Sequence, residues 1–150
     1  MFEIFGEFDS AEEINQAAAE LLTNGEHEKI YNLAKENGID KEIAEAFIDG
    51  DISIITDPLM AAVGKIDLER GGINDPVYNG IKEDIFNWIL SACQDEAFAR
   101  AVRSKGKSLK GCINHCKAGT GKLLNNQAGS VPDRVVYGFV REYYMGGDKN

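Results

Sequence analysis

Two cysteines and a histidine in the C-terminal half have the residue types of a metal site. Cys112, His115 and Cys116 stand at positions i, i+3 and i+4, so their side chains would share one face of a helix, as zinc ligands must. A fourth ligand would have to come from Cys93 or His27. Structural zinc sites usually combine two paired clusters of ligands, whereas this sequence contains one cluster.

The same segment can also be interpreted as part of a hydrophobic core. Leu109, Cys112, Ile113 and Cys116 follow helical spacing, and free cysteines are commonly buried. We favour this interpretation, which places His115 at the edge of the buried stripe, and we expect no metal and no other cofactor. A cysteine–histidine nucleophile is disfavoured because the pair has no evident orienting partner. We therefore expect no enzymatic activity.

Two further segments resemble known binding motifs but lack the residues or the charge that those motifs need. The AGTGK run at 118–122 resembles the end of a phosphate-binding loop, but Cys116 replaces its first glycine and Leu123 replaces the hydroxyl residue that would bind magnesium. Residues 33–48 have the outline of a helix-turn-helix. Their second helix is acidic and would face DNA phosphates, so a plain helical hairpin is the better interpretation.

Acidic and basic residues are distributed very unevenly along the chain. Residues 1–96 contain 22 Asp and Glu against 6 Lys and Arg, a net charge of −16, whereas residues 97–150 contain 3 against 10, a net charge of +7. The whole chain therefore carries −9. Such a division predicts either a protein with two oppositely charged surfaces or two halves that fold together and partly neutralise each other.

Two candidate binding surfaces follow from these charges. The basic candidates, for contact with a partner or a nucleic acid, are Arg100, Arg103, Lys105, Lys107, Lys110, Lys117 and Lys122. The acidic candidates, for occupying a basic channel in a partner, are Asp40, Glu42, Glu45 and Asp49. Nearby tyrosines, Tyr137, Tyr143 and Tyr144, could stack on bases, although core packing is the interpretation we favour for them.

The elements that must position these residues are helical, and the fold class is all-α. Apolar residues recur at helical spacing between capping residues and glycines. The expected helices lie between Ser10 and Gly25, across Ile30–Ala34 up to Gly38, between Asp40 and Gly50, and over 57–69, 75–92, 95–104, 108–117 and 131–147, the last of them capped by Asp133.

We expect residues 1–150 to form a compact multi-helix single domain. It would consist of an acidic helical part at 1–70, a linker at 71–75 and a basic helical part at 76–150. The Gly- and Asn-rich segment 118–130 is the expected mobile loop.

Composition indicates a cytoplasmic protein that does not enter a membrane. The first residues lack the basic and apolar regions of a secretory signal, and the longest apolar stretch, IFNWILSAC at 85–93, is much too short for a membrane span. Three cysteines, an odd number, argue against a disulfide framework.

Four blocks of sequence resemble the PcfK-like proteins of bacterial mobile elements. They are FGEFDSAEEINQAAAELL at 5–22, LAKENGIDKEIAEAFIDG at 33–50, DEAFARAVRSKGKSLKGCI at 95–113 and VREYYMGG at 140–147. The run K-G-K-S-L-x-x-C-I is the most distinctive of these, whereas the segment around 118–130 shows no resemblance. His115 departs from the family pattern, in which this position is bulky and apolar or aromatic.

The resemblance implies a non-catalytic protein that acts by binding. The PcfK-like group includes anti-CRISPR proteins, so the implied partner is a type II CRISPR effector nuclease, with or without its guide RNA. The acidic side chains would compete for the nuclease's basic channel, and the basic side chains would contact guide RNA or displaced DNA. The alternative is a nucleic-acid-binding accessory protein of a conjugative or other mobile element.

Overall fold

Eight α-helices make up the regular secondary structure of the residues that the computed structural model describes, which are 2–74, 79–127 and 129–146. These residues contain no β-strand, so the all-α prediction is confirmed. The helices are α1 (Ala11–Thr23), α2 (His27–Glu36), α3 (Lys41–Ile48), α4 (Pro58–Gly72), α5 (Asn79–Ala92), α6 (Glu96–Arg103), α7 (Leu109–Leu123) and α8 (Asp133–Met145). None of the described helices is both long enough and apolar enough to cross a membrane.

Local sequence sets where most of these helices begin and end. The hydroxyl of Ser10 accepts a hydrogen bond from the Glu13 amide at the start of α1, and Ser108 caps α7 in the same way. The Asp57 carboxylate caps α4, with Pro58 in the first turn. Gly25, at φ +70°, directly follows the C-cap of α1, which is the place where a left-handed residue closes a helix.

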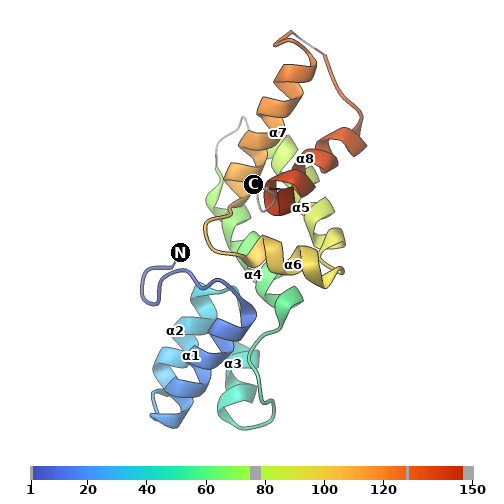
Figure 1. Ribbon diagram of the computed structural model, residues 1–150. Helices are drawn as coiled ribbons and strands as arrows, with labels where there is room; N and C mark the ends of the chain where they lie inside the picture. The colour runs from blue at the N-terminus through green and yellow to red at the C-terminus, as the bar shows by residue number, and fades with distance from the viewer. Residues whose placement is uncertain (1, 75–78, 128, 147–150) are drawn as a thin grey trace.

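Two hydrophobic clusters are joined through α4. The first cluster lies among α1, α2 and α3 and includes Ile55 and Ala61, while the second lies among α4 to α8 and includes Ala62 and Ile66. Helix α4 is therefore buried on two sides, and it packs most closely on α6. Figure 1 shows α1–α3 at one end and α5–α8 at the other, with α4 between them. Together the helices form one compact domain.

A close backbone contact joins α4 to the turn between α2 and α3. Gly38 has φ +68°, and a Cβ placed on it would lie 2.5 Å from the Gly64 carbonyl oxygen. A Cβ on Gly64 would in turn collide with the Asn37 carbonyl oxygen. Both positions therefore need glycine, because a side chain on either would push α4 away from the N-terminal helices.

Helix α7 is longer than the sequence predicted, so the expected mobile loop at 118–130 is wrong in its first part. The helix continues through the Gly-rich run to Leu123 and is followed by Asn125 and Asn126, which have φ of 51° and 59°. The ring of Phe139 on α8 lies against Gly119, where a Cβ would be only 2.7 Å away. Tertiary packing of α8 on α7 thus outweighs the weak helix propensity of glycine. Ala128 lies outside the described residues.

Two boundaries also differ from expectation. Gly71 and Gly72 belong to α4, and Ile73 is buried in the second cluster, so the expected linker at 71–75 begins inside a helix. Its last residue and the predicted start of the next helix at 75–76 lie outside the described residues. Pro132 takes the N-cap position of α8, and Asp133 is the first helical residue.

Candidate interaction surfaces

The acidic residues that the sequence indicated lie together on α3 and its flanks. Asp40 is the N-cap of α3, Glu42 and Glu45 lie within it, and Asp49 directly follows it. All four side chains are exposed, and in the part of the chain that the structure describes none of them forms an ion pair. We call these four residues the acidic face.

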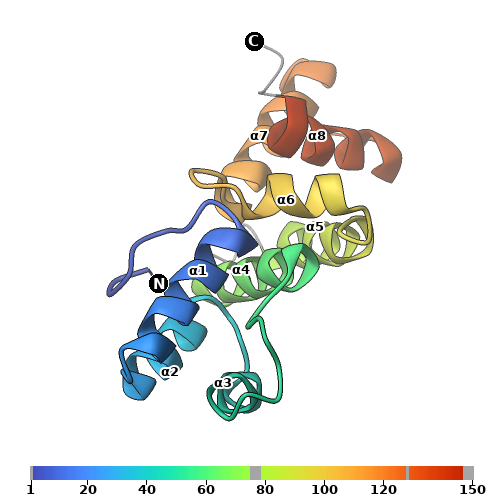
Figure 2. The same cartoon turned by 60° about the horizontal axis from the view of Figure 1, so that its bottom comes forward.

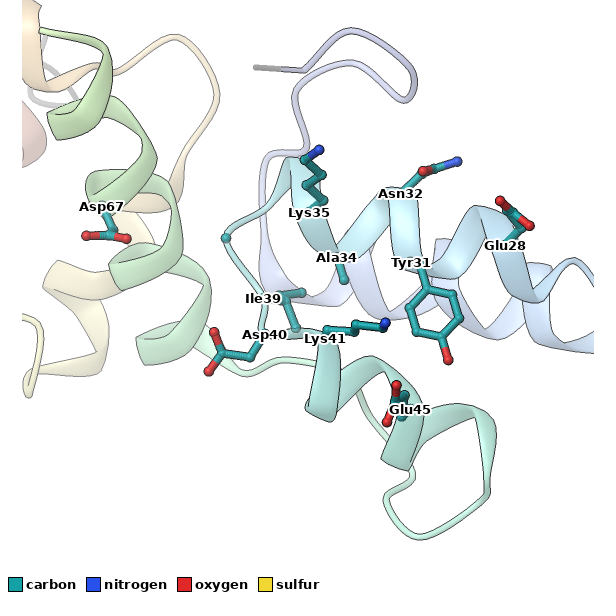
Figure 3. A pocket seen from close by; sticks show the side chains of 11 residues that line it. Glu28, Tyr31, Asn32, Ala34, Lys35, Ile39, Asp40, Lys41, Glu45 and Asp67 are labelled. Atoms are coloured by element: carbon teal, nitrogen blue, oxygen red, sulfur yellow. The ribbon is translucent and has the colours of Figure 1, made fainter.

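A groove of about 720 Å³ borders the acidic face between α2, α3 and α4. Figure 3 shows Tyr31 and Glu28 projecting from α2, with Lys41 and Glu45 on α3 and Asp67 across the groove on α4. The Lys41 Nζ atom lies 5.9 Å from the centroid of the Tyr31 ring. The Tyr31 ring is therefore already approached by a cation of the protein itself.

The basic loop at 104–107, between α6 and α7, is held by the acidic N-terminus. The Asp9 carboxylate accepts a hydrogen bond of 2.7 Å from the Lys105 amide, and the Glu7 carboxylate accepts one of 3.0 Å from the Gly106 amide. The Lys65 ammonium donates to the Ser104 carbonyl oxygen at 2.9 Å and forms an ion pair with Glu7 at 3.2 Å. These contacts fix the start of the KGKSLKGC segment to the N-terminal half.

Arg100 is paired within the protein, although its side chain is exposed. Its guanidinium donates two hydrogen bonds of 2.9 Å to Glu12 and one of 3.0 Å to Glu96. The hydrogen bonds from Arg100 lower the pKa of Glu12 to about 2. The interpretation that the two halves fold together and partly neutralise each other is therefore confirmed at this pair.

Two other predicted basic residues also turn inward. Arg103 is 1% exposed, and its guanidinium donates to the Asn37 side-chain oxygen at 2.9 Å. Burial lowers the pKa of Arg103, while the carboxylates of Glu7 and Glu69 act in the opposite direction. Lys107 is half-buried and donates to the Tyr143 carbonyl oxygen. Both side chains were expected to contact a partner or a nucleic acid, which requires them to face outward, and the structure corrects this expectation.

The remaining basic candidates are exposed. Lys105 lies in the loop, and Lys110, Lys117 and Lys122 lie on α7. Lys110 and Lys117 are two helical turns apart and therefore share a face, about 10 Å from each other along the axis. The structure thus leaves a lysine row on α7 and separates it from Arg100 and Arg103.

The side chains of the cysteine–histidine segment point in different directions. Leu109, Cys112, Ile113 and Cys116 are all buried, which confirms that they form the core stripe of α7. His115 is partly exposed, and its Nε2 atom lies 2.7 Å from a Glu142 carboxylate oxygen on α8. A hydrogen bond with Cys116, together with burial, raises the pKa of Cys112 well above its usual value, so Cys112 is a neutral thiol at neutral pH.

The three tyrosines of α8 contact other aromatic side chains. Tyr144 is 1% exposed, and its ring meets that of Phe98 edge-on. Tyr137 stacks on Trp88 with ring centroids 5.2 Å apart. The Tyr143 hydroxyl accepts a hydrogen bond from the Ser108 amide. Core packing is confirmed for Tyr144, while Tyr137 and Tyr143 are partly buried.

Sequence reasoning missed a group of buried charges between the two halves. Lys65 is 1% exposed, and Glu69, one turn further along α4, accepts a hydrogen bond of 3.2 Å from the Leu109 amide at the start of α7. Burial raises the pKa of Glu69 to about 7 and lowers the pKa of Lys65. Helical spacing provided a signal, since Lys65 follows the buried Ala61 by four residues.

We expect the stability of the protein to fall as the pH rises from about 5 through 7 and to level off above that. The pKa of Glu69 is raised from 4.5 to about 7 in the folded state, so the contribution of its neutral carboxyl is complete below 4.5 and is lost as the pH rises through 7. Between about pH 5 and pH 8 the free energy of unfolding should fall by an amount on the order of 2 kcal/mol, allowing for partial solvent access. Urea unfolding at each pH measures this change.

Glu69→Gln is the matched variant, because glutamine can still accept the Leu109 hydrogen bond without ionising. It should flatten the pH dependence and be more stable than the wild type at the higher pH. Lys65, Glu7 and Arg103 also face this carboxyl, and none of them is changed. A wild-type stability that stays level or rises over this interval would contradict the raised pKa.

In the comparison with known proteins, only the C-terminal part of the chain matches a family. Residues 78–149 match the family model described as PcfK-like protein. These residues, which we call the PcfK-like region, are thus similar to that family. The PcfK-like region holds α5–α8 with the lysine row, and it includes two of the four resembling blocks, at 95–113 and 140–147. It also spans 118–130, where the sequence showed no resemblance.

The acidic face and the groove lie in the N-terminal helices, outside the PcfK-like region. The blocks at 5–22 and 33–50 also lie outside it. No curated protein and no solved structure matches the chain.

Proposed function

We propose that this protein is a non-catalytic inhibitor that binds a type II RNA-guided DNA nuclease, alone or with its guide RNA, and acts in the bacterial cytoplasm. The observation that supports this proposal most directly is the difference between the two charged surfaces. The four carboxylates of the acidic face are exposed and form no ion pair among the described residues, whereas Arg100 is paired with carboxylates and Arg103 is buried.

The chemistry of the proposed partner fits the acidic face. Such nucleases hold the guide–target duplex in a positively charged channel and read a short DNA motif with arginines. A protein surface with closely spaced carboxylates can occupy such a channel and exclude nucleic acid from it, and the opposite charges accelerate association.

A DNA-cleavage assay with a purified type II nuclease tests the proposal, with the protein added before or after guide loading. The wild type should inhibit cleavage, and the order of addition shows whether guide loading or a later step is blocked. The quadruple variant Asp40→Asn, Glu42→Gln, Glu45→Gln and Asp49→Asn should inhibit about tenfold less well, which corresponds to about 0.35 kcal/mol for each exposed charge.

Lys110→Gln, Lys117→Gln and Lys122→Gln together form the control variant, because they remove exposed charge from α7 and leave the acidic face intact. This variant should inhibit as the wild type does. Equal inhibition by the acidic-face variant would contradict the proposed contact. Absence of inhibition with several nucleases would overturn the proposed function itself.

The lysine row supports a second candidate, a nucleic-acid-binding accessory protein of a conjugative or other mobile element. The chain has no acidic residue between Ala97 and Pro132, and exposed lysines lie along α7 in that stretch. Under this alternative, the protein alone should bind DNA or RNA, and binding should weaken steeply with salt. The triple lysine variant would then reduce the slope of log affinity against log salt by about 3.

A further inference from the structure

An apolar surface lies beside the acidic face, where α3 leads into α4. Ile52 and Ile54 in the connecting loop are 37% and 52% exposed, and Met60 in the first turn of α4 is 36% exposed. The partly buried Ile43 of α3 lies next to them. We call Ile43, Ile52, Ile54 and Met60 the apolar patch. Figure 2 shows α3 and this loop at the outer edge of the molecule.

The apolar patch is hollowed rather than flat. One hollow of about 480 Å³ is lined by all four of its residues. A second, of about 390 Å³, is lined by Ile43 and Met60 together with Leu59, Val63 and Leu90. The two hollows are neighbours, because Ile43 and Met60 line both, and together this depression extends from the loop past α4 to Leu90 on α5. Contiguous apolar surface of this kind on a folded protein usually marks a contact with another molecule.

The rim of this depression is acidic. Asp51 and Asp57 line the first hollow, and Asp40 lines the second. The loop at 49–57 contains three aspartates and no basic residue. The surrounding part of the chain, residues 1–70, carries 17 acidic and 5 basic residues, a net charge of −12. A partner that binds here must therefore present apolar side chains flanked by positive charge.

We propose that the apolar patch is the docking surface for a basic amphipathic helix of a partner protein. Apolar side chains at helical spacing on that helix would enter the two hollows, and lysines or arginines at its edges would pair with Asp40, Asp51 and Asp57. This inference rests on the proposed function, since it specifies which element of the partner the acidic end of the molecule contacts.

The acidic charges around the apolar patch disfavour the other occupants. In a two-fold dimer through the patch, the acidic rims of both copies would face each other and repel. Nucleic acid and anionic lipid surfaces carry the same sign of charge as the rim. A basic amphipathic helix complements both features, since its apolar side chains fit the depression and its positive charges pair with the acidic rim.

A synthetic amphipathic helix tests the proposal without the nuclease. The probe is a fluorescent peptide of about 18 residues with leucines on one face and lysines and arginines on the other, and the control peptide has glutamates in place of the basic residues. Fluorescence anisotropy should show salt-sensitive binding of the basic peptide and none of the acidic one. Ile52→Ser with Ile54→Ser should weaken the binding about tenfold or more, because apolar contact area is lost.

Leu123→Ser is the matched control, because Leu123 is also an exposed apolar residue, at 57%, but lies at the end of α7. It should bind the basic peptide as the wild type does. Circular dichroism and thermal unfolding check that the variants remain folded. Equal binding by the double isoleucine variant overturns the proposal. So does a wild-type dimer in light scattering that the double variant converts to a monomer, since a second copy would then cover the patch.

The cleavage assay separates this inference from the proposed function. If the acidic-face variant loses inhibition while the double isoleucine variant retains it, the proposed function stands and the docking surface is refuted. If no nuclease is inhibited but the peptide result holds, the docking surface stands and the proposed nuclease partner is refuted.

Discussion

Arg103→Ala is expected to lower the free energy of unfolding by about 3–5 kcal/mol, a large part of the roughly 5–15 kcal/mol that stabilises a domain. The guanidinium is 1% exposed, hydrogen-bonds the Asn37 side chain and lies 5.5 Å from the centroid of the Phe2 ring. Its removal leaves the half-buried carboxylates of Glu7 and Glu69 with less positive charge nearby. It also leaves a cavity at the junction of the two halves.

Arg100→Ala is the matched control, one turn earlier on the same helix. Arg100 is 44% exposed and forms its ion pairs in solvent, so this change should lower the free energy of unfolding much less than Arg103→Ala does. Urea unfolding of both variants measures the difference in free energy. Similar losses for the two variants would show that Arg103 is not the buried charge that the structure describes.

Arg100 and Arg103 show how much about the orientation of a basic side chain could be predicted from the sequence. Both count equally toward the basic surplus of the C-terminal half. Helical spacing nevertheless distinguishes them, because Arg103 follows the buried Ala99 by four residues and therefore lies on the buried stripe of α6. The net charge of a segment says nothing about orientation, whereas the helical periodicity of the same segment does.

Helices were predictable where local signals agreed. Ser10, Asp57 and Ser108 each precede an apolar run at helical spacing, and each caps the helix expected there. The prediction failed at 118–123, where the local glycines signalled a loop. These residues are helical because Phe139 packs against Gly119, and the two residues are twenty apart in the sequence.

The partners of the charged residues that link the two halves could not be predicted from the sequence. Lys65 pairs with Glu7, and Arg100 pairs with Glu12, across 58 and 88 residues of chain respectively. Pairs of this separation depend on how α1 and α6 are placed around α4, and local patterns carry no information about that placement. The acidic face needed no such information, because all its carboxylates lie on or beside one short helix.

The second large effect is expected at the backbone contact between the two halves. Gly64→Ala should lower the free energy of unfolding by about 3 kcal/mol or more, the upper part of the range for overpacked interiors. The added Cβ would collide with the Asn37 carbonyl oxygen, and this atom belongs to the backbone and cannot rotate aside. Helix α4 would have to move away from the α2–α3 turn. That movement would disturb the Arg103–Asn37 hydrogen bond as well.

Gly71→Ala on the same helix separates this collision from helix propensity. A Cβ at Gly71 meets no atom within 4 Å, so alanine there should be neutral or stabilise α4 by up to about 1 kcal/mol. Urea unfolding of the two variants should therefore give changes of opposite sign or very different size. A mild effect of Gly64→Ala would mean that the two halves are free to move apart at α4. The Arg103→Ala loss should then be small too, because both variants act on the same junction.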